Sequence, residues 1–226
     1  MLRGMAIVVA LFAVPVLFRP AVAEDKPGET IKLFNGKDLS GWQVFVNPKE
    51  KATPEPVWSV KDGVIVCKGK PLGYLITEKE YGNYVLKVQW RWAPEGDNKD
   101  RNSGVFVHVS GPDKIWPKGV EAQLYRDHAG DFWLVDGFKL VVDEKQQDPN
   151  SKNHYLRMKK SGVEKSIGEW NQYEITCKDG TIKLVVNGVP QNEGRHAESS
   201  KGKILLQSEG AEIHFRNIEL TPIKGE

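Results

Sequence analysis

Residues Tyr84–Trp92 read YVLKVQWRW, and this stretch decides the fold class because it alternates along its whole length. Every second residue, starting from Tyr84, is a large apolar one, and the residues between them are V, K, Q and R. Successive side chains of an extended chain point to opposite faces. The pattern therefore predicts a β-strand with one buried and one outward face.

Short runs of the same kind continue on both sides of this strand. Turn signals separate several of them, and Asp179-Gly180 and Asn187-Gly188 have the composition of two-residue hairpin loops. No segment has a sustained helical period, and the polar segment 144–161 predicts a long loop. Many short strands at short intervals predict an all-β sandwich or barrel. The expected strands are Val57–Val60, Val64–Cys67, Tyr74–Thr77, Tyr84–Trp92, Gly104–Val109, Gly119–Tyr125, Trp170–Lys178, Thr181–Val186, Lys203–Gln207 and Glu212–Leu220.

The N-terminus has the layout of a cleavable signal peptide. Arg3 precedes an apolar run from Met5 to Phe18, and Ala21-Val22-Ala23 is a cleavage signal of small residues. The run is shorter than the about 20 residues that span a bilayer, although an uncleaved anchor is the alternative. We expect residues 1–23 to be the signal peptide, 24–30 a disordered lead-in, and 31–226 one domain. The protein would then be secreted or periplasmic, with no membrane span after cleavage.

Charge and cysteine content exclude some functions and leave one question open. The chain has 32 basic and 30 acidic side chains, and cleavage would remove Arg3 and Arg19. A mature chain of balanced charge gives no reason to expect nucleic acid as a partner. Cys67 and Cys177 are the only cysteines, and in an exported protein they could form a disulfide or stay as two buried thiols.

On the central strands, polar residues fall on the face opposite the apolar ones. Val105, Val107 and Val109 fit the core, as do Ala122 and Leu124. If these strands are neighbours, one surface carries carboxyl, imidazole, guanidinium and amide groups, which suits a ligand with many hydroxyls. Glu or His could also act there as a general acid or base, although most outward polar residues are simply solvated. The outward set is Arg91, His108, Glu121, Gln123, Tyr125 and Gln207, with Glu209 two residues beyond.

Two tryptophans occur in loops on either side of Glu121. Trp116 and Trp133 could stack on sugar rings, or could pack against their own loops. The sequence leaves both interpretations open.

Several strings, taken in order, resemble the 3-keto-disaccharide hydrolase family. The family is a branch of the concanavalin A-like lectin/glucanase sandwiches, so the resemblance implies a two-sheet antiparallel jelly-roll sandwich. It covers nearly all of the mature chain, and each string alone is weak. The strings are LFNGKDLSGW (Leu33–Trp42), NSGVFVH (Asn102–His108), Glu121-Ala122-Gln123, GEWNQY (Gly168–Tyr173), the Asn187-Gly188 turn, and FRNIEL (Phe215–Leu220).

The resemblance implies an enzyme that breaks the glycosidic bond of 3-keto-glucosides or 3-keto-disaccharides. The ketone acidifies the hydrogen on C2, a base removes it, the C1 oxygen leaves with help from an acid, and water then adds. An electrophile at the ketone oxygen is also needed, and a divalent metal ion could supply it. The resemblance implies Glu121 as the base or a metal ligand, and His108 as the acid or a metal ligand. The residues expected to orient the sugar are Arg91, Asn102, Gln123, Tyr125, Gln207, Trp116 and Trp133.

The sequence departs from the family pattern at two places. Many members carry Arg or Lys where His108 stands, and many carry Asp-His-Gly where this chain has Ser208-Glu209-Gly210. Glu209 is therefore a third catalytic candidate, as a replacement for the missing His. The alternatives are a non-catalytic carbohydrate-binding sandwich, a structural or protein-binding sandwich, and a conventional glucanase. A glucanase needs two carboxylates on one face, and Glu209 is the only partner candidate for Glu121.

Overall fold

The computed structural model describes residues 28–51, 56–94 and 101–225. The predicted signal peptide at residues 1–23 lies outside the described residues, as does most of the expected lead-in. Within the described ranges, no helix is long and apolar enough to cross a membrane.

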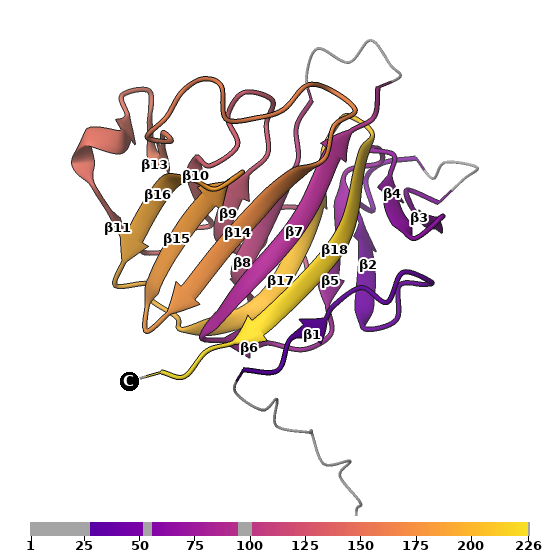
Figure 1. Cartoon of the computed structure of the whole chain (residues 1–226), viewed down its shortest axis with the longest axis horizontal. Helices are drawn as coiled ribbons and strands as arrows, with labels where there is room; N and C mark the ends of the chain where they lie inside the picture. The colour runs from indigo at the N-terminus through magenta and orange to yellow at the C-terminus, as the bar shows by residue number, and fades with distance from the viewer. Residues whose placement is uncertain (1–27, 52–55, 95–100, 226) are drawn as a thin grey trace, which may run out of the picture.

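Two antiparallel sheets pack face to face, which confirms the predicted two-sheet sandwich (Figure 1). Sheet I has the strand order β11-β16-β15-β14-β7-β18-β4-β3, with β1 paired to β18. Its strands are β1 (Ile31–Lys32), β3 (Trp58–Lys61), β4 (Val64–Cys67), β7 (Tyr84–Trp92), β11 (Val141–Val142), β14 (Asn171–Lys178), β15 (Thr181–Val186), β16 (Val189–Arg195) and β18 (Ile213–Pro222).

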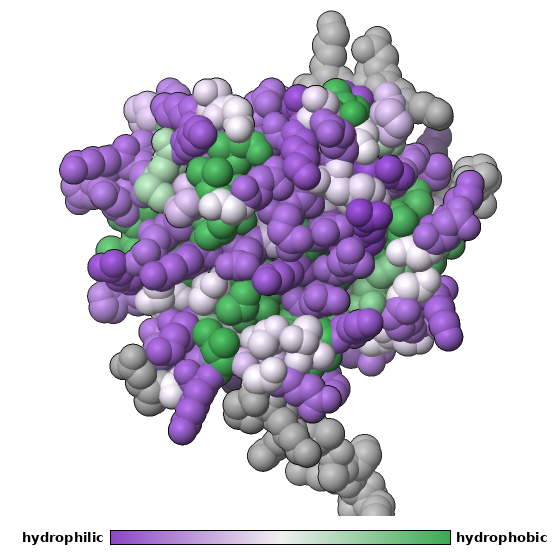
Figure 2. Space-filling view, viewed as in Figure 1, coloured by the Kyte–Doolittle hydropathy of each residue, from purple (hydrophilic) through white to green (hydrophobic). Residues whose placement is uncertain are grey.

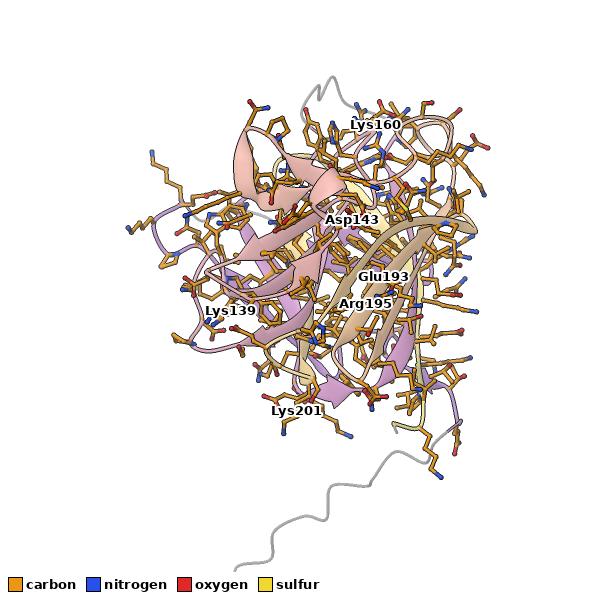
Figure 3. All side chains as sticks on the ribbon, turned by 90° about the vertical axis from the view of Figure 1, so that its left-hand side faces the viewer. Lys139, Asp143, Lys160, Glu193, Arg195 and Lys201 are labelled. Atoms are coloured by element: carbon orange, nitrogen blue, oxygen red, sulfur yellow. The ribbon has the colours of Figure 1, made fainter. Side chains whose placement is uncertain are left out.

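Sheet II has the order β12-β13-β10-β9-β8-β17-β5-β2, with β6 paired to β17. Its strands are β2 (Trp42–Val46), β5 (Gly73–Thr77), β6 (Tyr81–Gly82), β8 (Gly104–Ser110), β9 (Lys118–Gln123), β10 (Phe132–Val135), β12 (Gln147–Asp148), β13 (Ser151–Tyr155) and β17 (Lys201–Ser208). Seen from the side, the sheets form two layers (Figure 3), with Glu193 and Arg195 marking β16 of sheet I.

The core is one apolar layer between the sheets. Strand β7 alternates as expected, since Leu86, Val88 and Trp90 are fully buried in this layer. Trp90 packs against Tyr173 of β14, with ring centroids 5.4 Å apart. From sheet II, Val120 and Ala122 of β9 enter the same layer. The inward residues of both sheets thus fix which residues face outward.

The segment 144–161 differs from the predicted long loop. It contains a short 3₁₀ helix, η1 (Glu144–Gln146), followed by β12 and β13. Strand β13 pairs with β10, which was not expected as a strand either. Both strands are short, and β13 is polar, so neither shows a clear period of two. Their pairing is a tertiary effect that local sequence does not reveal.

A β-bulge at His108 overturns the expected facing of the end of β8. The pairing of β8 with β9 shifts register between Val107 and Ser110, and the backbone of His108 has φ +54°. The extra residue reverses the alternation beyond Val107. Val109 therefore packs on the outer face of sheet II with Phe106, while the buried His108 ring lies 6.4 Å from the core residue Phe138.

Both cysteines are buried free thiols, so of the two alternatives the structure has no disulfide. Cys67 lies on β4 and Cys177 on β14 of the same sheet. Burial is the main cause that raises the pKa of each thiol to about 12. They act as small core residues.

We predict that Trp90→Ala lowers the free energy of unfolding by about 3–5 kcal/mol, because it removes a fully buried aromatic side chain from the shared layer. Lys87→Ala on the outward face of the same strand is the matched control, and should change it by about 0.5 kcal/mol or less. Urea denaturation measures both. Equal losses in the two variants would contradict the assignment of faces.

Candidate functional site

The outer face of sheet II brings three of the predicted residues together. Glu121 on β9 pairs with Phe106 on β8, and two residues along, Gln123 pairs with Gly104. Leu206 on β17 pairs with Val105, so the next residue, Gln207, lies opposite Gly104. The register therefore gathers Glu121, Gln123 and Gln207 around the one glycine of β8.

A pocket of about 360 Å³ opens on this face. Its volume falls within the range of about 300–1,000 Å³ that is usual for small-ligand sites. Six of the predicted site residues line it, together with four that the sequence did not indicate. The predicted ones are Asn102, Trp116, Glu121, Gln123, Trp133 and Glu209, and the others are Leu134, Val135, Asp136 and Asn153.

Gly104 makes room for the Glu121 side chain. A Cβ atom added at Gly104 would lie 2.8 Å from Cγ and 2.9 Å from Cδ of Glu121, closer than real contacts allow. The Glu121 side chain therefore lies over the bare backbone of β8. This explains how Glu121 is only 6% exposed although it points away from the core.

The two carboxyl groups of the pocket hold protons more tightly than usual. Burial raises the pKa of Glu121 well above its ordinary value, and the charge of Glu209 raises it further. Burial also raises the pKa of Glu209, to about 7. Near neutral pH, Glu209 is therefore partly ionised, and the more deeply buried Glu121 has its pKa shifted in the same direction. Two carboxyl groups with raised pKa values thus share one pocket, and such groups are candidates for proton transfer near neutral pH.

Several buried polar atoms around these carboxyl groups have no partner among the described residues. They are Oε1 of Glu121, Oδ1 of Asn102, and both Oε1 and Nε2 of the Gln207 amide. Native proteins rarely bury polar atoms without a hydrogen bond, because each one costs free energy. A hydroxyl-rich ligand in the pocket would satisfy the atoms of Glu121 and Asn102, which line it, whereas Gln207 is 2% exposed and is not among the lining residues.

The backbone holds the pocket residues in place. Asn102 forms isolated β-bridges with Glu209 and Gly210, which brings the loop before β8 beside the loop after β17. The side-chain oxygen of Gln123 accepts hydrogen bonds from the backbone N–H groups of Leu124 and Tyr125, both at 2.7 Å. Gln123 therefore has a structural task at the end of β9 as well as a place in the pocket.

Tyr125 does not join this face. Strand β9 ends at Gln123, so Tyr125 lies in the following turn, with its ring 5.4 Å from that of His128. The expectation that Tyr125 shares a strand face with Glu121 was therefore wrong. The signal for a strand continued in the sequence because Leu124 is still a core residue.

Arg91 lies on the other sheet. It is on β7 of sheet I, where its guanidinium stacks over Trp170 at 4.6 Å, and Arg216 stacks over the same ring at 4.0 Å. Figure 2 shows this outer face of sheet I, which is mostly hydrophilic. The expectation that Arg91 meets Glu121 was wrong, because alternation tells which way a residue points but not which sheet holds it.

His108 is also separate from the pocket. The bulge described above buries its ring on the core side of sheet II, near Phe138. Burial is the main cause that lowers its pKa to about 4, and the Ser199 backbone offsets this in part. The ring is therefore neutral near pH 7, and it does not face Glu121 as expected.

A divalent metal ion was one possible source of the electrophile, and the described residues offer no ready ligand set for it. No group of three or more His, Cys, Asp or Glu side chains within the described ranges is arranged to hold a metal ion. The two pocket glutamates alone do not make a complete ligand set of the usual kind. We therefore derive no step through a metal.

The two packed antiparallel sheets define a sandwich of the concanavalin A-like type. Residues 29–221 match the model of the 3-keto-alpha-glucoside-1,2-lyase-like domain, and the chain belongs to this family. A candidate glycosyl hydrolase from Parabacteroides distasonis has a similar structure, with a TM-score of 0.63 and 26% identity over 87% of this chain and 94% of that one.

More distant structures share the fold alone. A β-glucanase from Bacillus licheniformis has a TM-score of 0.53 and 13% identity over 89% of this chain and 100% of that one. The carbohydrate-binding module CBM66 from Bacillus subtilis has a TM-score of 0.55 and 9% identity over 79% and 94%. No curated protein sequence gives a significant match to this chain.

We predict that Glu209 makes the protein lose stability as pH rises from about 4.5 to about 7, so that Glu209→Gln reduces the loss over this window. The unfolded chain ionises Glu209 near the ordinary value of 4.5, whereas the folded chain does so only at about 7. A raised acid pKa gives stability below the unfolded value that is lost through this window. Denaturation at a series of pH values measures it.

Glu78→Gln, an exposed change outside the pocket, is the control for this measurement. It should keep the wild-type dependence on pH. An unchanged slope in Glu209→Gln would contradict the raised pKa.

Proposed function

We propose that this protein is an exported enzyme that breaks the glycosidic bond of 3-keto-glucosides or 3-keto-disaccharides by elimination followed by hydration. The observation that carries the proposal is the pair of carboxyl groups, Glu121 and Glu209, which line one pocket and both have raised pKa values. Membership of the lyase-like family supports the substrate class. Export rests on the N-terminal sequence pattern alone.

Elimination uses the two groups in opposite roles. Ionised Glu209 takes the proton from C2, which the neighbouring ketone has made acidic, and the electron pair forms an enolate. The C1–oxygen bond then breaks as the enolate collapses to a C1=C2 double bond, and Glu121 gives its proton to the leaving oxygen. The products are an alcohol and a 3-keto-2-hydroxy-glucal. Glu209 is now protonated and Glu121 is ionised.

Hydration reverses the roles and restores the starting state. Glu121, now ionised, takes a proton from water as the water oxygen adds to C1. Glu209 returns a proton to C2. The two steps together add one water molecule across the glycosidic bond, and neither carboxyl group gains or loses a proton overall.

The other pocket residues would bind the sugar. The orphan Oδ1 of Asn102 is an acceptor and is suited to a sugar hydroxyl group. Trp116 and Trp133 offer aromatic faces to the apolar side of a sugar ring. Compared with the sequence-based expectation, the proposal makes Glu121 the acid and gives Arg91, His108 and Tyr125 no contact with substrate.

A conventional glycoside hydrolase is the second candidate, because the same acid and base could act on an ordinary glycosidic bond. The candidate glycosyl hydrolase at 26% identity favours it. A non-catalytic carbohydrate-binding domain is the third, since a binding module shares the fold. The experiment must separate all three.

The test is incubation of the full-length mature protein with 3-keto-trehalose and, in parallel, with trehalose, in D₂O. Glu209 holds the proton taken from C2 while the alcohol leaves, and a carboxylic proton exchanges with D₂O, so the 3-keto-glucose product should carry deuterium at C2. Conventional hydrolysis leaves C2 untouched. Samples with chelator and with added divalent metal test whether a metal contributes.

Turnover of the 3-keto sugar alone, with deuterium at C2, is the expected result. Turnover of trehalose without deuterium at C2 would favour the conventional hydrolase instead. Binding of either sugar without any turnover, with or without metal, would overturn the enzyme proposal in favour of a binding domain.

We predict that Glu209→Gln lowers kcat on the 3-keto sugar by about 10²–10⁴-fold, the usual contribution of a general base. In the wild type, kcat/KM should rise with pH around a midpoint of about 7, as Glu209 ionises, and fall at higher pH, as Glu121 ionises. Glu174→Gln makes the same change on the outer face of sheet I and should leave both unchanged. A pH profile without the limb near 7 would contradict the assigned base.

We predict that Gly104→Ala lowers kcat by about 10²-fold, because the new Cβ displaces the Glu121 side chain by a fraction of its length. The melting temperature should fall only slightly, because the flexible Glu121 side chain can move away from the new Cβ. Gly111→Ala is the control, because its new Cβ would meet open space outside the pocket. It adds backbone strain at a φ of +85° but should leave kcat unchanged. Full activity in Gly104→Ala would contradict the close approach.

A further inference from the structure

Trp133 has a cationic partner that the proposed reaction does not use. Its indole stacks on the imidazole ring of His154, with centroids 4.2 Å apart and planes within 9°. The two residues are directly paired between β10 and β13. Trp133 pairs on its other side with Glu121 of β9. The indole thus stands between His154 and the acid of the pocket.

Hydrogen bonds fix the His154 ring at both nitrogens. Nδ1 lies 2.7 Å from Oδ2 of Asp148, and Nε2 lies 2.9 Å from Oδ2 of Asp131. A carboxylate only accepts hydrogen bonds, so both ring nitrogens must donate, and only the imidazolium has two N–H groups. His154 is therefore held as a cation in a fixed plane.

Asp131, which binds Nε2 of His154, is itself held in place by several contacts. Its side chain is completely buried, and Oδ1 accepts a hydrogen bond from the backbone N–H of Arg157 at 2.7 Å. The Arg157 guanidinium is 3.8 Å away, and Nδ1 of His128 lies 2.9 Å from Oδ2. The backbone carbonyl of Asp131 accepts from Gln123 at the end of β9. Asp131 is thus tied to the strand that carries Glu121.

The geometry points to His154 as a positioning residue, which holds the Trp133 indole so that its free face takes the sugar ring of the substrate. This rests on the function proposed above, because it assigns a role within the same pocket. A strand side chain can change rotamer, and a half-buried tryptophan has room to do so. The flat contact with a ring clamped at both ends keeps the indole in one orientation.

The charge of His154 follows from the groups around it. Burial would lower its pKa, but the hydrogen bonds and negative charges of Asp131 and Asp148 outweigh this and raise it. His128 and Arg157 contact the same Asp131 carboxylate. Trp133, whose ring stacks on His154, carries no charge. The backbone N–H of Asn150 and then His154 itself lower the pKa of Asp148. The imidazolium therefore persists to higher pH than that of an ordinary histidine.

The test compares His154→Gln with His128→Gln. Both lose a histidine that bonds to Asp131, but the His128 side chain is 43% exposed and lies at a tilt beside Tyr125 rather than flat on Trp133. His154→Gln should raise KM for 3-keto-trehalose roughly tenfold, with kcat changed less than about threefold, as expected for a lost aromatic contact. His128→Gln should match the wild type. Equal effects of the two variants would overturn the inference.

A double-mutant cycle separates positioning from a general loss of structure. If His154 acts through Trp133, His154→Gln should have no further effect on KM in a Trp133→Ala background. The same tenfold rise in that background would overturn the inference. The same cycle can be measured without turnover, as the affinity of these variants for the sugar in a Glu209→Gln background.

A spectroscopic signature provides a readout independent of activity. A stacked imidazolium quenches indole fluorescence, so the Trp133 contribution, taken as the difference from Trp133→Phe, should rise when pH passes the raised pKa of His154. His154→Gln should be brighter and insensitive to this change. Protein that binds sugar and has this signature but never turns over would overturn the proposed function alone. A Trp133 signal independent of His154 would overturn the inference.

Discussion

The single apolar layer between the two sheets is the constraint on which the rest of the molecule depends. Burying Val120 and Ala122 of β9 in this layer turns Glu121 and Gln123 outward, because a strand alternates with a period of two. A slip of one residue would bury the carboxyl group in the core and expose the valine. The pocket thus follows from the packing on the opposite side of the same strand.

The strand register determines which of the outward residues become neighbours. The antiparallel pairing of β8, β9 and β17 brings Gly104 beside Gln123 and Gln207, and diagonally under Glu121. Without a side chain at that one position, the carboxyl group is buried on a face that is nominally outward. Burial then raises the pKa of Glu121, so the chemistry of the site is a consequence of a missing Cβ.

The sequence was sufficient to predict the fold class, most central strands and the outward direction of Glu121, Gln123 and Gln207. These depend on a local period of two, reinforced by the family resemblance. It was not sufficient for His108, where a single bulged residue reverses the facing, or for Arg91, whose strand belongs to the other sheet. The stacking of His154 on Trp133 was missed because β13 is polar and depends on pairing with β10, a contact between distant segments. Sequence patterns report facing, whereas bulges and sheet membership are decided by tertiary packing.

The same sandwich carries glucanases and binding modules, so the fold alone does not decide what this protein does. The pocket distinguishes it, because two glutamates with raised pKa values share one cavity with two tryptophans and the unpartnered amide oxygen of Asn102. The central claim is that Glu121 holds a proton at a pH at which Glu209 has lost one. Two interacting carboxyl groups titrate as a pair, so both must be followed together.

The most direct measurement is an NMR titration of protein labelled with ¹³C at the glutamate side-chain carboxyl groups, with Glu121→Gln and Glu209→Gln used to assign the two signals. The account predicts that the Glu209 signal moves around pH 7 while the Glu121 signal still reports a protonated carboxyl group. Two signals that both move near pH 4.5 would contradict it, because neither group would then be available as an acid at neutral pH.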